Sequence, residues 1–274
     1  MRRFNLEDKT AVITGGGGGI GRGIALALAH RGAAVVLAGR RVEPLLSTAD
    51  AVRTLGGQAA VVVGDITTAE ARRNLLERAQ RAFGAIHVLV NNAGVLAGGG
   101  LLQLGGAEIE RAVATNLGAP VDLTRLFLPD LMHTRGAVVF VGSTASRVPL
   151  PYTSLYSATK AGLHAFCTAL RYELLPLGVH LLEAFPPTVD TRLTETMARN
   201  AGRWAGRRED AEAAGERIVA ALAAGQDEVQ WGAGERLLIA LQRCAPRLLA
   251  ALLATQRRRF ARIMTPARDK SVNG

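Results

Sequence analysis

Short apolar runs alternate with longer stretches of helical periodicity along most of the chain. Residues 20–30 carry Ile24, Leu26 and Leu28 among alanines, a helical pattern, whereas shorter apolar runs read as buried strands. Such runs surround Val12 and Ile13 and recur at 33–38, 59–63, 86–90 and 179–184. Strands that alternate with helices imply βαβ units. The pattern predicts an α/β fold with a doubly wound parallel sheet and helices on both faces, in a single domain over residues 1–235.

Residues 236–274 differ from this domain and form a predicted C-terminal helical extension. At about 100° per residue, arginines fall on one side of a helix and apolar residues on the other. The arginines are Arg236, Arg243, Arg247, Arg258 and Arg262, and the apolar residues are Leu237, Leu238, Leu241, Leu248, Leu249, Leu252 and Ile263. Pro246 predicts a break into two helices.

Two interpretations of this amphipathic extension remain open. In the first, Leu241, Leu248, Leu249 and Leu252 are buried against the body or a second subunit, and the arginines face solvent. In the second, the extension is a basic amphipathic helix that lies on a membrane surface. We favour the first. Nucleic-acid binding is not expected, because no aromatic interleaving or known module supports it.

The charge of the chain is concentrated in the extension. The 274 residues have a net charge of +10, and residues 236–274 hold nine basic residues and one acid, a net charge of +8. The other 235 residues therefore carry only +2. The body is nearly neutral and the extension strongly basic.

Composition indicates a cytoplasmic protein. Cys167 and Cys244 are too few for a disulfide framework and suit a reducing compartment, and the five histidines show no metal-ligand spacing. The N-terminus lacks the apolar region of a signal peptide, and no run of about 18 apolar residues is present. We expect no metal, and only the extension suggests peripheral membrane contact.

A glycine-rich segment lies between the first strand and the first helix. Gly15 to Gly19 are followed by Ile20, Gly21, Arg22 and Gly23. Glycines let the backbone turn sharply beside a pyrophosphate, and the helix N-terminus supplies N–H groups with a partial positive charge. The residues fit G-x-G-x-x-G from Gly16 and T-G-x-x-x-G-x-G from Thr14 equally well. A kinase-type phosphate loop is disfavoured, because Arg22 and Gly23 occupy its Lys and Ser/Thr positions.

The end of the second strand indicates which dinucleotide is preferred. The strand at 33–38 is followed by Gly39, Arg40 and Arg41, and the nearest acid, Glu43, falls in the next helix. An NAD site places an acid there for the ribose 2′-OH, whereas an arginine suits a 2′-phosphate. Arg40 therefore favours NADP(H), although a solvated arginine pair at a helix start is the alternative.

Tyr156 and Lys160 are spaced so that both side chains lie on one face of a helix. A positive charge beside the phenol favours the phenolate, so this spacing predicts a lowered tyrosine pKa and an acid–base role. Ser143, on a neighbouring strand end, could hold the oxygen that exchanges the proton. The motif alone is weak, since it also describes a core tyrosine beside a solvated lysine.

Taken together, these motifs resemble the short-chain dehydrogenase/reductase family, of the single-domain, Rossmann-like type. The resemblance covers roughly residues 8–195. It rests, in family order, on Thr14-Gly15-x-x-x-Gly19-x-Gly21, Asp65, Asn91-Asn92-Ala93-Gly94, Asn116, Ser143 and Tyr156-x-x-x-Lys160. Each motif is weak by itself, and the full set is highly specific.

The resemblance implies a role for each of these residues. Tyr156 would be the general acid in reduction and the base in oxidation, with Lys160 lowering its pKa and binding the nicotinamide ribose. Ser143 would orient the substrate oxygen, and Asn116 would hold a relay water at a helix kink. Cofactor contacts would come from Thr14, Gly15, Gly19, Ile20, Gly21, Arg40, Asp65, Ile66, Asn92, Ala93, Gly94, Tyr156, Lys160, Pro186, Val189 and Thr191. Without the family context, Asp65 and Asn116 would read as an Asx turn or a cap.

The chain departs from the family pattern at two positions. Pro187 stands where the family usually has glycine before the nicotinamide contact, and proline fixes φ and removes a donor. Gly18 replaces the arginine that many NADP-preferring members carry in the loop, so recognition of the 2′-phosphate would depend more on Arg40. Val189 and Thr191 are retained as expected contacts.

The sequence thus predicts an NADP(H)-dependent oxidoreductase, with NAD(H) as a weaker option, that interconverts a carbonyl and an alcohol. Residues 148–152 and a lid at 191–208 should set specificity for an apolar substrate. The alternatives are a cofactor-binding sensor or scaffold without turnover and a sugar-nucleotide epimerase, for which the chain is short. The resemblance also implies a homodimer or homotetramer that pairs through helices at 111–135 and 154–175.

Overall fold

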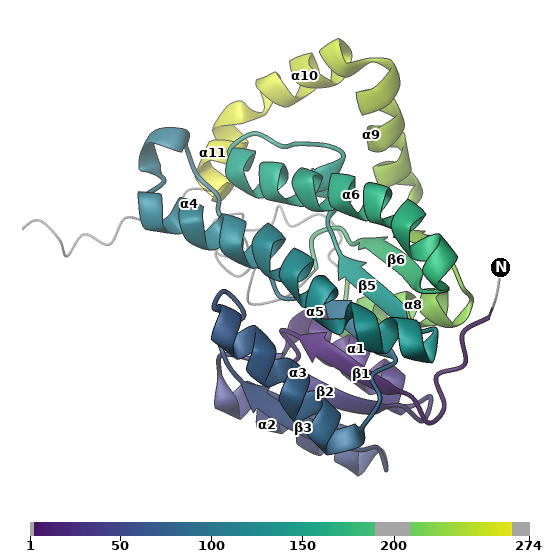
Figure 1. Ribbon diagram of the computed structural model, residues 1–274. Helices are drawn as coiled ribbons and strands as arrows, with labels where there is room; N and C mark the ends of the chain where they lie inside the picture. Colours follow the sequence, from purple (N-terminus) through teal and green to yellow (C-terminus); the bar gives the residue numbers. More distant parts are fainter. Residues whose placement is uncertain (1–2, 190–208, 265–274) are drawn as a thin grey trace, which may run out of the picture.

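The sheet of the protein has seven parallel strands in the order β3-β2-β1-β4-β5-β6-β7 (Figure 1). The structure is a computed structural model, and it describes residues 3–189 and 209–264. The strands are β1 (Thr10–Thr14), β2 (Ala34–Gly39), β3 (Ala59–Val63), β4 (Val88–Asn91), β5 (Ala137–Val141), β6 (His180–Phe185) and β7 (Glu228–Gln230). The order reverses direction between β1 and β4, so the sheet is doubly wound as predicted.

Helices cover both faces of the sheet. The helices that follow the first six strands are α1 (Gly19–Ala29), α2 (Val42–Thr54), α3 (Ala69–Phe83), α4 (Gly106–Val113), α5 (Ala119–Thr134), α6 (Ser154–Leu174) and α8 (Ala211–Ala223). Short 3-10 turns occur at Leu101–Gln103, Thr144–Ser146 and Leu175–Leu177. After β7 the chain ends in α9 (Ala233–Cys244), α10 (Pro246–Thr255) and α11 (Arg257–Met264).

Successive residues of the central strands point to opposite faces of the sheet and belong to two separate hydrophobic cores. On one face, Ile13 of β1 packs with residues of α1, α2 and α8, such as Ile24. On the other face, Val12 of β1 packs with residues of α3, α5 and α6, such as Leu123 and Leu163. Both faces of a doubly wound sheet are buried, which explains why its strands read as continuous apolar runs.

Two glycines allow α1 and α8 to cross closely under the sheet. A Cβ on Gly215 would lie 2.2 Å from the carbonyl carbon of Gly23, and a Cβ on Gly23 would lie 2.5 Å from Ala211 O. Glycine inside a helix costs about 0.5–1 kcal/mol relative to alanine, so close packing must compensate. This crossing holds the first turn of α1 against the sheet edge where the cleft opens.

The C-terminal helices extend beyond the sheet. Figure 1 shows α9 and α10 as the outermost elements beyond α6, with α11 returning toward the start of α6. Phe260, Ile263 and Met264 of α11 form a small core with Leu150 and Tyr152. The predicted break at Pro246 is confirmed, but a second break at Gln256 gives three helices where two were predicted. The first of them begins at Ala233, slightly before the predicted boundary.

Candidate active site

A cleft of about 620 Å³ opens where the strands end at their carboxyl sides. The loops after six strands contribute to its wall, with Gly15 after β1, Arg40 after β2, Asp65 after β3, Ala93 after β4, Ser143 after β5 and Pro186 after β6. Ligands of doubly wound sheets bind at this edge, near the point where the strand order reverses. The cleft therefore lies where the fold places a binding site.

The glycine turn has one register that requires glycine. Gly15 and Gly19 have φ of 67° and 53°, in the left-handed region that favours glycine. A Cβ on Gly21 would lie 2.2 Å from Gly15 O, whereas one on Gly18 would meet no atom within 4 Å. The T-G-x-x-x-G-x-G register is thus the one the backbone uses.

The start of α1 at this turn suits an anionic group. Its first turn contains no acidic residue, and no side chain caps it among the described residues. Unpaired N–H groups and the helix dipole leave a partial positive charge at such an end. Together with the close backbone approach allowed by Gly15 and Gly19, this end fits the pyrophosphate of a dinucleotide.

Thr14 and Asn92 join the glycine turn to the loop after β4. The Thr14 hydroxyl donates to Val90 O (3.2 Å) and accepts from the backbone N–H groups of Asn92 (3.0 Å) and Ala93 (3.1 Å). The Asn92 amide donates to Thr14 O (2.9 Å). Thr14 lies behind the cleft wall, as does Gly21, and it positions Ala93 and Gly94, which line the cleft.

Arg40 and Asp65 lie together at the end of the cleft beside β2 and β3. An Arg40 Nη1 atom is 3.9 Å from Asp65 Oδ2, and both side chains are about half exposed. Burial opposes ionisation of Asp65, but hydrogen bonds from Thr67 and the charges of Arg40 and Arg111 give it a lowered pKa. Arg41 also lines the cleft. This end of the cleft thus combines an ionised acid with two arginines.

Asn116 lies in the predicted kink between α4 and α5. Residues Ala114–Gly118 form a π-helical segment, a feature that often marks a functional site. The Asn116 amide accepts from Val95 N (2.8 Å) and donates to Val95 O (2.9 Å) and to the Thr159 hydroxyl (3.1 Å). Asn116 therefore fixes the loop after β4 to α6; its relay role stays a prediction.

Ser143, Tyr156 and Lys160 line the same part of the cleft. Tyr156 and Lys160 lie on α6, with Lys160 Nζ 6.0 Å from the centre of the Tyr156 ring. The ammonium donates to Val141 O (2.9 Å), at the end of β5. Ser143 is hydrogen-bonded to the Tyr156 side chain. The structure therefore brings together the three residues that the sequence singled out.

The pKa values differ from the sequence-based expectation. Burial raises the pKa of Tyr156, and the hydrogen bond with Ser143 opposes this only in part. Burial also lowers the pKa of Lys160, to about 8. The lysine ammonium donates to the backbone carbonyl of Val141, and the pKa of Tyr156 stays raised despite the positive charge nearby. The phenol is consequently protonated at neutral pH, and Lys160 is still charged there.

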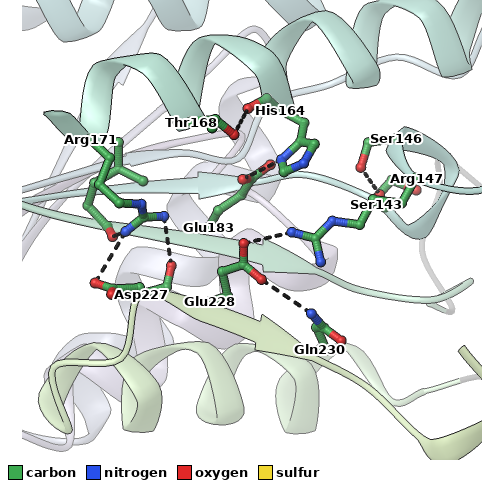
Figure 2. Close-up of polar contacts among 11 residues, drawn as sticks. Ser143, Ser146, Arg147, His164, Thr168, Arg171, Glu183, Asp227, Glu228 and Gln230 are labelled. Carbon is green, nitrogen blue, oxygen red and sulfur yellow. Dashed lines mark hydrogen bonds and ion pairs between the residues drawn. The ribbon is translucent and has the colours of Figure 1, made fainter. Parts of the chain in front are cut away.

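Behind Ser143, polar side chains link the 143–147 turn and α6 to the last two strands (Figure 2). Arg147 pairs with Glu228 of β7 (2.6 Å), and His164 Nδ1 lies 2.9 Å from Glu183 Oε2 of β6. Burial raises the pKa of Glu183, and His164 opposes the shift. His164 thus has a structural partner and lies outside the cleft lining.

Sequence reasoning missed several residues of the cleft. Arg111 of α4, Thr115 beside Asn116 and Met264 of α11 line it, and none of the motifs includes these three positions. Pro187, at the position where the family has glycine, lines the cleft together with Ile20, Ile66, Pro186 and Val189. Thr191 and the expected lid at 191–208 lie outside the described residues.

Comparisons with known proteins agree with this geometry. Residues 9–202 match the family described as short chain dehydrogenase. The chain is 38% identical over 197 residues to the ketoacyl reductase HetN of Nostoc sp., covering 69% of each protein. It is 36% identical over 201 residues to 11-beta-hydroxysteroid dehydrogenase A of Sesamum indicum, covering 72% of this chain and 57% of that protein. The chain thus spans less than two thirds of the second relative.

The fold has a similar solved structure. A short-chain type dehydrogenase/reductase from Mycobacterium marinum superposes with a TM-score of 0.77 at 27% identity, covering 84% of this chain and 96% of the other. The range that matches the family, residues 9–202, contains the glycine turn, Ser143, Tyr156 and Lys160. The chain belongs to the short-chain dehydrogenase/reductase family of oxidoreductases, which act on CH–OH groups with NAD(P) as acceptor.

Proposed function

We propose that the protein is an NADP(H)-dependent oxidoreductase that interconverts a carbonyl and an alcohol, with Tyr156 as the general acid and base. The observation that carries this proposal is the convergence of Ser143, Tyr156 and Lys160 on the cleft that also contains the glycine turn. A proton donor and a dinucleotide turn in one cleft are what carbonyl reduction requires.

Several groups of residues would hold the cofactor. The turn at Gly15 and Gly19 with the start of α1 would hold the pyrophosphate, and Asp65 and Ile66 would contact the adenine. Lys160 would bind the nicotinamide ribose. When bound, the nicotinamide supplies or accepts the hydride. The remaining chemistry, a proton transfer to or from the substrate oxygen, belongs to the side chains of this chain.

In reduction, Tyr156 donates its proton to the substrate oxygen. Its raised pKa keeps the phenol protonated at neutral pH, which is the form that a general acid needs. Ser143 holds the same oxygen in place. The charge of Lys160 stabilises the phenolate left behind, and Tyr156 then takes up a proton from solvent. In oxidation the proton transfer is reversed, and deprotonated Tyr156 accepts the proton of the alcohol as a base.

The preference for NADP(H) is proposed from Arg40, with Arg41 beside it. Both line the cleft at the end of β2, where the ribose 2′ position of a dinucleotide falls in this fold. A guanidinium forms charge-assisted, often bidentate bonds to phosphate. Asp65 is already paired with Arg40, which leaves it less suited to a ribose hydroxyl.

An apolar substrate is proposed from the wall beside Tyr156. Leu96, Leu150 and Met264 line the cleft there, and Leu150 falls in the segment expected to set specificity. The two relatives named above are a ketoacyl reductase and a hydroxysteroid dehydrogenase. Both names describe substrates that carry a carbonyl or hydroxyl group on a largely apolar molecule.

Homo-oligomerisation is proposed through α4, α5 and α6. Ala158, Ala165 and Ala169 of α6 are exposed, so a second copy could approach this helix closely. Tyr172, on the same helix, is 76% exposed. Light scattering at micromolar concentration should give a dimer or tetramer mass, and a monomer mass would refute the proposal.

A panel of ketones, aldehydes and alcohols with both cofactors tests the proposed function. Reduced-nicotinamide absorbance should change with at least one apolar carbonyl or alcohol, and faster with NADP(H) than with NAD(H). Cofactor binding without turnover across the whole panel would favour a sensor or scaffold over an enzyme.

A further inference from the structure

The two outer helices α9 and α10 expose leucines that the body does not cover. Leu237 and Leu238 of α9 are 68% and 40% exposed, and Leu248 and Leu252 of α10 are 55% and 50% exposed. In α9 no residue is buried, and in α10 only Leu249 is. Of the four leucines predicted to be buried, Leu249 is buried and Leu241 is only partly covered, whereas Leu248 and Leu252 are exposed. Such clustered exposed leucines indicate a surface that meets an apolar partner.

The charge around these leucines identifies the chemistry of that partner. Arg236, Arg243 and Arg247 on α9 and α10 are exposed, and Arg257–Arg259 and Arg262 follow on α11. From Pro246 to Met264 the chain holds no acidic residue. The arm formed by α9, α10 and α11 of a second copy would carry the same positive charge and be repelled. An anionic lipid surface offers both an apolar interior and opposite charge.

The geometry of the two helices fits a flat surface. Among the described residues, no single helix is long and apolar enough to cross a membrane; α9 and α10 pass that test only together, and their axes are bent by 119°. Two helix axes that meet at one break share a plane, so both helices can lie on a bilayer at once. Arginine side chains can keep their head groups at the lipid phosphates while neighbouring leucines enter the acyl boundary.

We propose that α9 and α10 dock the protein on the surface of an anionic membrane. Leu237, Leu238, Leu248 and Leu252 insert into the interface, and the arginines contact the lipid phosphates. The protein lies on the membrane and does not span it.

The position of α11 connects this surface to the cleft. It follows α10 directly, and Phe260 and Ile263 hold it on Leu150 and Tyr152, the segment just before α6. Met264, at its end, lines the cleft. The docking surface and one wall of the cleft therefore belong to one continuous arm. This step rests on the proposed function: a docked enzyme would draw its apolar carbonyl or alcohol from the bilayer.

Vesicle co-sedimentation of the full-length chain tests the docking without any turnover. We expect binding to phosphatidylglycerol-containing vesicles at least about tenfold stronger than to phosphatidylcholine vesicles, and falling at high salt. Equal binding to both lipids, or no binding to either, would overturn the proposal. The outcome does not depend on whether an enzymatic substrate has been found.

Matched variants locate the contact. Leu248→Gln with Leu252→Gln should reduce anionic vesicle binding about tenfold or more. In the wild type, docking transfers these two apolar side chains from water into the lipid, and glutamine loses that gain. Leu55→Gln with Leu175→Gln changes two leucines that are exposed on the body, at 43% and 78%, and should leave binding unchanged. Equal losses in both double variants, or no loss in the α10 variant, would contradict docking through this face.

Two further measurements distinguish docking on lipid from unfolding of the variant and from self-association. Because Leu248 and Leu252 are exposed in the free chain, their replacement should leave the melting temperature unchanged. The mass in solution without lipid should also be the same for the wild type and the α10 variant. A smaller mass for the variant would mean that a second copy covers the leucines, and the proposal would be abandoned.

Discussion

The body and the C-terminal arm of this chain use apolar residues in opposite ways. In the body, Ile13, Val36 and Val138 lie on sheet strands with none of their surface exposed. In the arm, which we define as α9, α10 and α11, Leu237 and Leu248 remain more than half exposed. The sheet of the body is covered on both faces by the body's own helices, whereas α9 and α10 present leucines that their own chain does not cover.

The same contrast holds for charge. The body is almost neutral, and arginines that it partly buries pair with acids, as Arg72 does with Asp122 (2.6 Å). The arginines of α9 and α10 are exposed, and α10 and α11 contain no acidic residue. Burying an unpaired charge costs much free energy, whereas a solvated charge costs little and stays available for binding. We therefore assign catalysis to the body and membrane docking to the arm.

The replacement Tyr156→Phe is expected to have the largest effect and to act on the body alone. It removes the proton donor but keeps the ring, so turnover should fall about 10²–10⁴-fold. Cofactor binding, followed by fluorescence titration, should stay nearly unchanged, as should vesicle binding. Near wild-type kcat in this variant would remove Tyr156 from the mechanism.

The pH dependence of reduction should report Lys160. Its pKa is lowered to about 8 by burial, so kcat/KM for carbonyl reduction should fall by up to about tenfold per pH unit above that value. Lys160→Arg should lose the fall near pH 8, since arginine keeps its charge, whatever its absolute rate. A profile of the wild type that stays flat to pH 10 would contradict the assignment.

The stability of the folded chain separates this effect from unfolding. The folded-state pKa of Lys160 lies below the unfolded value of 10.5, so the unfolded chain binds more protons between about pH 8 and 10.5. The contribution of Lys160 to the free energy of unfolding therefore rises with pH in that window. Melting scans should show no Lys160-dependent loss of stability where activity declines.

The replacement Arg40→Ala should weaken NADPH binding about tenfold or more, because one well-placed phosphate contact contributes about 1.5–3 kcal/mol. NADH binding should barely change. Isothermal titration with both cofactors measures the difference, and Arg53→Ala, at an exposed arginine on α2, is the matched control. Equal affinity of the wild type for both cofactors would remove Arg40 as the selectivity residue.

The replacement Met264→Ala is expected to have the smallest effect and probes where arm and body meet. Met264 lines the cleft, and a few methylenes in an apolar pocket change discrimination by about 1–3 kcal/mol. KM for apolar substrates should rise about tenfold, while kcat for a small carbonyl stays the same. If KM for large and small substrates moved together, Met264 would not contact the substrate.

Much of the body could be predicted from the sequence, for physical reasons. The strand at 59–63 was predicted with the bounds it has in the structure, because buried parallel strands leave continuous apolar runs. The kink at Asn116 was expected from the family resemblance and is present as a π-helical segment. The register of the glycine turn could not be chosen, since it depends on φ at Gly15 and Gly19.

Other features depend on three-dimensional context that spacing alone does not carry. The pKa of Tyr156 is set by burial and by the direction of the Lys160 ammonium, which points to Val141 O. Met264 reaches the cleft only because α11 folds back on Leu150. For the arm, amphipathicity predicted the helices and their exposed arginines, but it could not say which leucines the body would cover.

The most direct test of the division between body and arm is a crossed measurement on two variants. Tyr156→Phe and the double variant Leu248→Gln with Leu252→Gln are each assayed for turnover of a water-soluble carbonyl and for binding to anionic vesicles. We predict that the first loses turnover and keeps vesicle binding, and that the second loses vesicle binding and keeps turnover within about twofold. Loss of both properties in either variant would contradict the account.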